Sequence, residues 1–110
     1  MNSHEKIIKI ADLYGYENQS MQTVEEMAEL TKAISKLRRA RKIGTPKLVK
    51  KYRKKVLEEI GDVTIMLRQL MHLLDGAKRT NKVIDSKLDR QIKRMEEAGM
   101  ITREAIKSFK

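Results

Sequence analysis

The chain has 110 residues, which is enough for one folded domain and too few for a second independent core. Lys and Arg number 25 against 15 Asp and Glu, for a formal net charge of +10, and a content of 36% charged and 40% hydrophobic residues excludes collagenous, disulfide-rich and disordered classes. The longest run without a charged residue spans only Asn18–Val24, so no transmembrane helix is predicted.

Apolar residues recur at helical spacing along the whole chain, and no stretch alternates apolar and polar residues as a half-buried strand would. The pattern predicts a first helix over residues 4–14, with Ser3 as its N-cap and Gly15 as the left-handed residue that ends it. A second helix is predicted over residues 19–42 and ends at Gly44.

Thr45 and Pro46 then provide a cap and a proline at the first helical position, so a third helix is predicted from Pro46 to about residues 75–76. A fourth helix is predicted over residues 81–98 and is closed by Gly99. The remaining tail adds at most one short turn.

Long helices joined by short turns pack antiparallel, so we expect an all-α antiparallel bundle of about four helices. The whole chain, residues 1–110, is predicted to be one domain, with its core over about 4–98 and a short C-terminal tail over 99–110. The apolar faces of the second and third helices are too wide for so short a chain to cover. We therefore expect the bundle to be completed by oligomerisation.

The chain contains no cysteine, which excludes disulfides and thiolate metal sites. Its first residues, MNSHEKIIKIADL, contain no continuous apolar segment of the kind that a secretory signal requires. These observations favour a cytoplasmic location, and we expect no membrane partner.

The positive charge is concentrated in one segment. Eleven basic residues and no acidic one lie between Lys36 and Lys55, so the rest of the chain is almost neutral. Such a segment is either a solvated turn with its flanking helix ends or a surface for phosphate or nucleic acid. The sequence leaves both interpretations open.

Carboxylates occupy the apolar faces of two consecutive helices. Helical spacing places Glu59 and Asp62 in the apolar stripe of the third predicted helix, and Glu26 and Glu29 on or beside that of the second. An isolated buried carboxylate costs several kcal/mol, so these acids require compensation. Salt bridges to Lys or Arg are one solution, and a bound divalent cation is the simpler one for two such pairs.

The donor set selects the kind of metal. Oxygen ligands on facing helices suit Mg²⁺ or Mn²⁺. Zinc is poorly supported because the chain has only two histidines, His4 and His72, and helical spacing puts His72 on the far side of its helix from Glu59. The sequence therefore predicts a magnesium site, with manganese as a possible substitute.

The segments YGYENQSMQTVEEMAELTKAISK and LEEIGDVTIMLRQL resemble the MazG-like nucleotide pyrophosphohydrolases of the all-α NTP pyrophosphatase superfamily. The signature of that family is ExxE, a variable spacer and ExxD, which here are Glu26-x-x-Glu29 and Glu59-x-x-Asp62, preceded by a glutamine, Gln19 or Gln22. The resemblance covers roughly residues 13–95. It implies a Mg²⁺-dependent enzyme that cleaves a (d)NTP between the α- and β-phosphates, and an obligate homodimer or homotetramer.

The same resemblance assigns roles to residues. It implies that the four acids hold the metal and are the catalytic residues, one of them, with Glu29 as a candidate, orienting the attacking water. It also implies a phosphate-binding role for basic residues that lie one turn before Glu59 and in the next helix, namely Lys55, Lys87, Arg90 and Arg94. The spacer between the motifs is long and basic, and Gln91 stands where the family often has arginine.

A competing interpretation is a basic helical protein that binds nucleic acid, or acts as a regulator, through Lys36–Lys55. It explains the basic segment but leaves the acids on the apolar faces unexplained. We therefore prefer the enzyme and expect no nucleic-acid partner. The sequence does not select the nucleobase, for which Tyr14, Tyr16 and Tyr52 are the candidate stacking residues.

Overall fold

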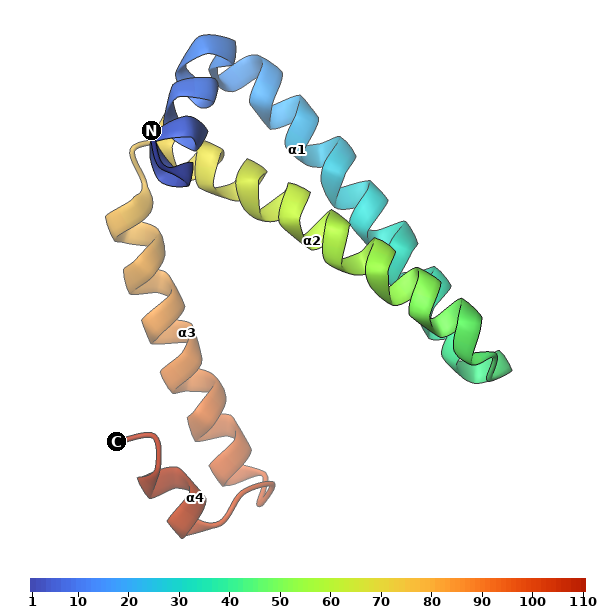
Figure 1. The fold of residues 1–110 in the computed structure, drawn as a ribbon. Coiled ribbons are helices and arrows are strands. Elements are labelled where there is room, and N and C mark those ends of the chain that lie inside the picture. The colour runs from blue at the N-terminus through green and yellow to red at the C-terminus, as the bar shows by residue number, and fades with distance from the viewer. The chain divides into compact units, whose positions relative to one another are not determined.

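The computed structural model describes residues 1–110 and is entirely helical, without strands. Its helices are α1 (Ser3–Ile43), α2 (Pro46–Leu73), α3 (Ala77–Glu97) and α4 (Arg103–Lys107) (Figure 1). The predicted all-α class with about four helices is confirmed. None of these helices combines the length and the apolar composition that crossing a bilayer requires.

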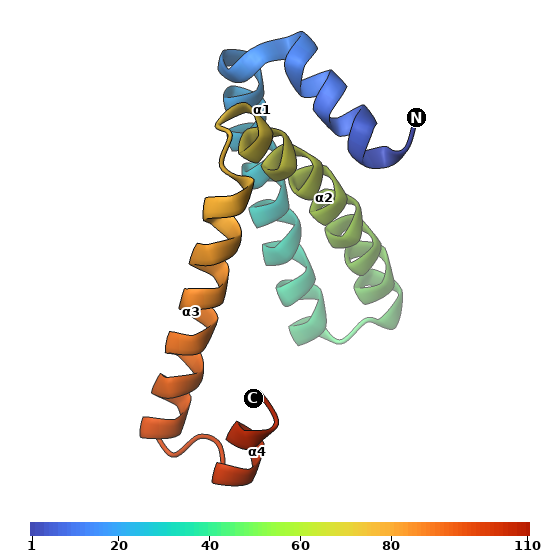
Figure 2. The same ribbon diagram turned by 90° about the vertical axis from the view of Figure 1, so that its left-hand side faces the viewer.

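The first two predicted helices meet at a sharp kink at Gly15, and both lie within the range of α1. Gly15 leaves the helical conformation, with φ 83° and ψ 167°, and the chain becomes helical again directly after it. Figure 2 shows the N-terminal segment turning away from the rest of α1. The N-cap is Asn2, whose Oδ1 accepts a 2.8 Å hydrogen bond from the Glu5 amide, so Ser3 lies inside the helix and is not its cap. Gly15 thus ends the first predicted helix, as expected, and the second begins directly after it.

A tight turn joins α1 to α2. The helix ends at Gly44, as predicted. Gly44 has a left-handed conformation (φ 83°, ψ 16°), and its amide donates to the Ala40 carbonyl at 3.0 Å. Thr45 is the N-cap of α2 and Pro46 its first residue, as the sequence predicts. The two helices therefore run antiparallel and lie side by side in both views (Figures 1 and 2).

The core of this hairpin is a seam with a seven-residue period. On α1 the seam carries small buried residues, Ala33 and Ala40, which let the two backbones approach closely. On α2 the buried apolar residues include Val56 and Val63, again seven residues apart. Knobs-into-holes packing between antiparallel helices has this period, so the seam resembles a short coiled coil.

The N-terminal segment before Gly15 packs on the C-terminal half of α2 through polar contacts. Gln69, which is 1% exposed, donates to the Ile7 carbonyl at 3.3 Å and accepts from Gln19 Nε2 at 2.7 Å. His72 and Asp12 are also in contact, at 2.8 Å. These contacts fix the bend and satisfy the buried amide of Gln69.

The chain divides into two compact units, Met1–Asp75 and Gly76–Lys110. In the second unit α3 has no buried residue, and its apolar residues Ile84 and Leu88 are about half exposed. The predicted short turn in the tail is α4, which is capped by Thr102 and buries Ile106.

The hairpin also exposes an apolar strip. Its members directly follow seam residues on α1 and α2, so they flank the seam on one side. They are between 42% and 49% exposed, although each is a large apolar residue: Met27, Ile34, Ile60 and Leu67. Each of these side chains thus keeps close to half of its surface exposed.

Candidate functional site

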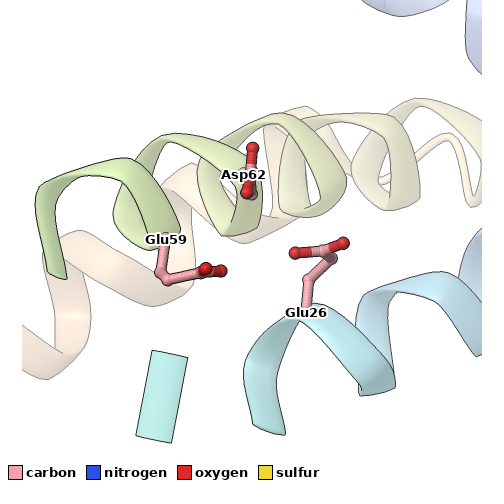
Figure 3. A group of neighbouring side chains, drawn as sticks. All are labelled: Glu26, Glu59 and Asp62. Carbon is pink, nitrogen blue, oxygen red and sulfur yellow. The ribbon is translucent and has the colours of Figure 1, made fainter. Parts of the chain in front are cut away.

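Three carboxylates meet across the α1–α2 seam. One oxygen from each of Glu26, Glu59 and Asp62 lies within 4.8 Å of the others. Figure 3 shows Glu26 on α1 opposite Glu59 and Asp62 on α2. Glu59 is buried, Glu26 is half-buried and Asp62 is exposed, so the group runs from the interior of the hairpin to its surface. We call it the acidic triad.

The seam itself brings the triad together. Glu26 lies seven residues before Ala33, and Glu59 lies seven residues before Met66, so both glutamates occupy positions that elsewhere carry core side chains. The two glutamates are at similar distances along the chain from the turn at Gly44 and therefore lie level with each other. Asp62 follows Glu59 by one turn on the same side of α2.

Glu59 is the least solvated member. Its Oε1 accepts a 3.0 Å hydrogen bond from Lys55 Nζ, but its other oxygen, Oε2, is buried and has no hydrogen-bond partner. The hydrogen bond and the charge of Glu59 raise the pKa of Lys55, so this lysine stays protonated at neutral pH. A buried carboxylate oxygen without a partner is rare in native proteins, and an ion or a water molecule could satisfy it.

Glu26 is positioned by Gln22, whose Nε2 donates to its Oε1 at 2.9 Å. Of the two glutamines that precede the first motif, Gln22 is thus the one that contacts the triad. Gln19 is buried at the bend instead, where it contacts Gln69.

The fourth predicted acid, Glu29, is exposed and lies outside the triad. It remains close enough for its charge to contribute to the raised pKa of Lys55. Burial therefore differs sharply among the four acids: Glu59 alone is in the core, and Asp62 is on the surface although helical spacing places it beside the seam.

The predicted phosphate-binding residues fall into two groups. Lys55 contacts the triad directly. The others are exposed residues of α3 in the second unit, where Lys87 and Arg90 line a surface hollow. Arg94 lies in the last turn of the same helix. The first unit thus carries the acids and one of the four predicted cations.

A basic cavity beside the triad was not predicted as a site. It has a volume of about 340 Å³ and lies between α1 and α2 in the first unit. Its lining residues are Lys36, Lys51, Tyr52, Lys54, Lys55 and Glu58. The only signal in the sequence was the basic segment Lys36–Lys55, whose role was left open.

The triad fits a hard divalent cation. It offers carboxylate oxygens only, at a spacing that one ion can bridge, and one of its members has a buried oxygen without a partner. Mg²⁺ and Mn²⁺ prefer such donors, whereas no histidine or cysteine is present in the group to favour zinc.

Comparison of the chain with protein-family models, with curated proteins and with solved structures found no match.

Proposed function

We propose that this chain is a MazG-like, Mg²⁺-dependent nucleoside triphosphate pyrophosphohydrolase. It would cleave (d)NTPs between the α- and β-phosphates to give a nucleoside monophosphate and pyrophosphate. The observation that supports this best is Glu59, a buried carboxylate with an unpartnered oxygen, grouped with Glu26 and Asp62 across the seam. The two motifs ExxE and ExxD supply these residues in the order that the resemblance requires.

Glu26, Glu59 and Asp62 are the residues that would hold Mg²⁺ or Mn²⁺. When bound, the ion supplies positive charge that offsets the charge of the triphosphate and makes water more acidic. Gln22 holds the Glu26 carboxylate in place through its amide. Because it is exposed and outside the triad, Glu29 is free to act as the residue that orients the attacking water.

Lys55 has a double role in this proposal. It neutralises Glu59 at 3.0 Å in the metal-free chain, and its ammonium group also lines the basic cavity, where it can bind a phosphate oxygen. Lys87, Arg90 and Arg94 are the further candidates for phosphate binding, from the second unit.

The apolar strip supports the proposal of a homodimer or homotetramer. Four large apolar residues along one side of the hairpin leave a continuous surface that burial in an interface would stabilise, by about 25 cal/mol for each Å² removed from water. A second copy of the hairpin, packed on this strip, would complete a helical bundle.

The alternative function is nucleic-acid binding through Lys36–Lys55. The observation in its favour is that ten of the eleven basic residues in this segment are exposed on the arms of the hairpin turn, outside contact with any carboxylate. It assigns no role to the triad.

The deciding experiment measures pyrophosphate release from common and modified NTPs with Mg²⁺. We expect activity on at least one nucleotide, loss of that activity by orders of magnitude in Glu59→Gln and Asp62→Asn, and no comparable loss in Glu25→Gln. Glu25 is an exposed neighbour of Glu26 and serves as the matched control. Absence of release from every nucleotide, or full activity in Glu59→Gln, would refute the proposal.

A further inference from the structure

We infer that the basic cavity at the α1–α2 hairpin is a binding subsite for a phosphate chain, and that Lys36, Lys51 and Lys54 act there together with Lys55. The identity of the physiological ligand rests on the proposed function: the subsite would hold the distal phosphates of the nucleotide that is cleaved. The cavity alone supports the ligand chemistry, a compact polyanion of which a linear polyphosphate is the simplest phosphate example.

The cavity has the size and charge for such a ligand. A volume of about 340 Å³ lies at the lower end of the range for small-molecule sites. Four lysines and a single acid, Glu58, line it, so the lining is strongly positive. Lys36 comes from α1 and the other three lysines come from α2, so the cations surround a concave surface.

Tyr52 gives this surface a fixed element. Its half-buried ring lines the cavity, and Lys51 Nζ lies 5.5 Å from the ring centroid. The face of an aromatic ring attracts an ammonium group, so the ring restricts where the Lys51 side chain can point. A cation held in this way loses less conformational entropy on binding an anion than a free surface lysine does.

The cavity is continuous with the acidic triad through one side chain. Lys55 lines the cavity and also donates to Glu59 of the triad at 3.0 Å. A phosphate chain whose reacting end lies at the triad would therefore meet Lys55 first and the remaining lysines beyond it. This arrangement extends the predicted phosphate-binding role of Lys55 to three further lysines of the basic segment, Lys36, Lys51 and Lys54.

A compact anion fits the surroundings better than a nucleic-acid backbone. Glu58 lines the cavity and Glu59 pairs with Lys55, so the positive charge is in excess only where the four lysines gather, which suits a compact anion seated among them. Other basic residues of the segment lie outside the cavity and line a separate hollow, namely Arg38, Arg39 and Lys42. A nucleic-acid surface would use the cavity lysines and these three residues alike, whereas the subsite uses only the cavity lysines.

The test measures the affinity of the full chain for inorganic tripolyphosphate by calorimetry, with EDTA present and at ~0.15 M salt. Removing two cavity cations in Lys36→Gln/Lys51→Gln should weaken binding about tenfold or more. The matched control, Lys47→Gln/Lys50→Gln, removes the same charge from exposed positions of the same segment outside the cavity, and should weaken it less than about threefold. Melting curves show whether each variant is folded.

A third variant links the cavity to the triad. Glu59→Gln removes the carboxylate that pairs with Lys55, so the lysine becomes available to the anion, and tripolyphosphate should bind several-fold more tightly. Unchanged or weaker binding in this variant would show that Lys55 does not serve the cavity, and would overturn the inference.

Other outcomes also decide. Equal weakening by the two double variants, or tighter binding of a single-stranded RNA of equal charge than of tripolyphosphate, would overturn the subsite in favour of a nucleic-acid surface. Binding through the cavity in a chain that releases no pyrophosphate from any nucleotide would support the subsite and refute only the proposed enzyme. If Lys36→Gln/Lys51→Gln leaves pyrophosphate release intact and the chain does not bind tripolyphosphate, the enzyme is supported and the subsite is refuted.

Discussion

Replacement of Glu59 by glutamine separates a metal ligand from a structural ion pair. Glu59→Gln nearly keeps the shape of the side chain and removes its charge from a position that is 5% exposed. In the wild-type chain without metal, that charge is buried with one oxygen unpartnered, and its single partner, Lys55, is largely exposed to solvent. We therefore expect the metal-free variant to be at least as stable as the metal-free wild type.

The magnitude follows from the burial. A buried ion carries an effective penalty of several kcal/mol, and one hydrogen bond from an exposed lysine offsets only part of it. A neutral amide that can use its own donor and acceptor should recover about 1 kcal/mol. For a unit of this size that corresponds to a rise in melting temperature of roughly 4–8 °C.

The assay is thermal unfolding with and without Mg²⁺. A ligand that binds only the folded chain stabilises it by RT ln(1 + [L]/Kd), about 2.7 kcal/mol at one hundred times Kd. The wild type and the control Glu25→Gln should show this shift, and Glu59→Gln should not. Without metal, Glu59→Gln should therefore be at least as stable as the wild type, whereas with Mg²⁺ the wild type should be the more stable of the two.

A structural ion pair predicts the opposite pattern. Removing one partner of a pair that stabilises the fold should lower stability, by about 3–5 kcal/mol if the pair is fully desolvated, and Mg²⁺ should change neither protein. A metal-free Glu59→Gln chain that melts several degrees below wild type, with no metal effect in either, would refute both the metal site and the account of its burial.

Three further predictions concern the scaffold. Gly15→Ala should lower the free energy of unfolding, measured in urea, by about 1–3 kcal/mol, because φ 83° with ψ 167° is accessible essentially to glycine alone. The control is Gly61→Ala. Gly61 is helical and has open space around it, so this variant should raise the free energy of unfolding by about 1 kcal/mol. Light scattering should give a multiple of 12.8 kDa for the wild type, and 12.8 kDa for Ile60→Lys in the apolar strip; a monomeric wild type would contradict the proposed interface. Because pairing with Glu59 raises the pKa of Lys55, the pair stabilises the fold fully at pH values below the pKa of an unpaired lysine. This stabilisation disappears as the pH rises through the raised pKa. In Lys55→Met, the free energy of unfolding should therefore fall less between neutral and alkaline pH than in the wild type.

Local signals predicted the hairpin well. The helix end at Gly44 and the proline at the start of α2 were both expected, because glycine permits and proline fixes particular backbone conformations whatever the tertiary structure. Gly15 shows the limit of such signals. Its positive φ and the end of the first helix were expected, but the direction in which the chain continues depends on the packing of the N-terminal segment against Gln69, fifty residues beyond Gln19.

The site was predicted in part for a similar reason. Helical spacing identifies the face on which a carboxylate lies, and it placed Glu26 and Glu59 on facing seams. It does not give how deeply a side chain is buried or how two helices align along their axes. The exposure of Glu29 and Asp62 could therefore not be predicted from helical spacing. The basic cavity was missed because its lysines come from two helices, and only the hairpin turn brings Lys36 opposite α2.

If the triad holds a metal ion as proposed, the small side chains of the seam have a consequence for ion selectivity. Mg²⁺ requires oxygens at about 2.0–2.1 Å, whereas Ca²⁺ takes them at about 2.3–2.6 Å, so the separation of α1 and α2 determines which ionic radius the triad can match. That separation is set in part by Ala33, about 10 Å along α1 from Glu26. A residue that contacts no ion would thus govern discrimination between the two cations, and enlarging it would favour the larger one.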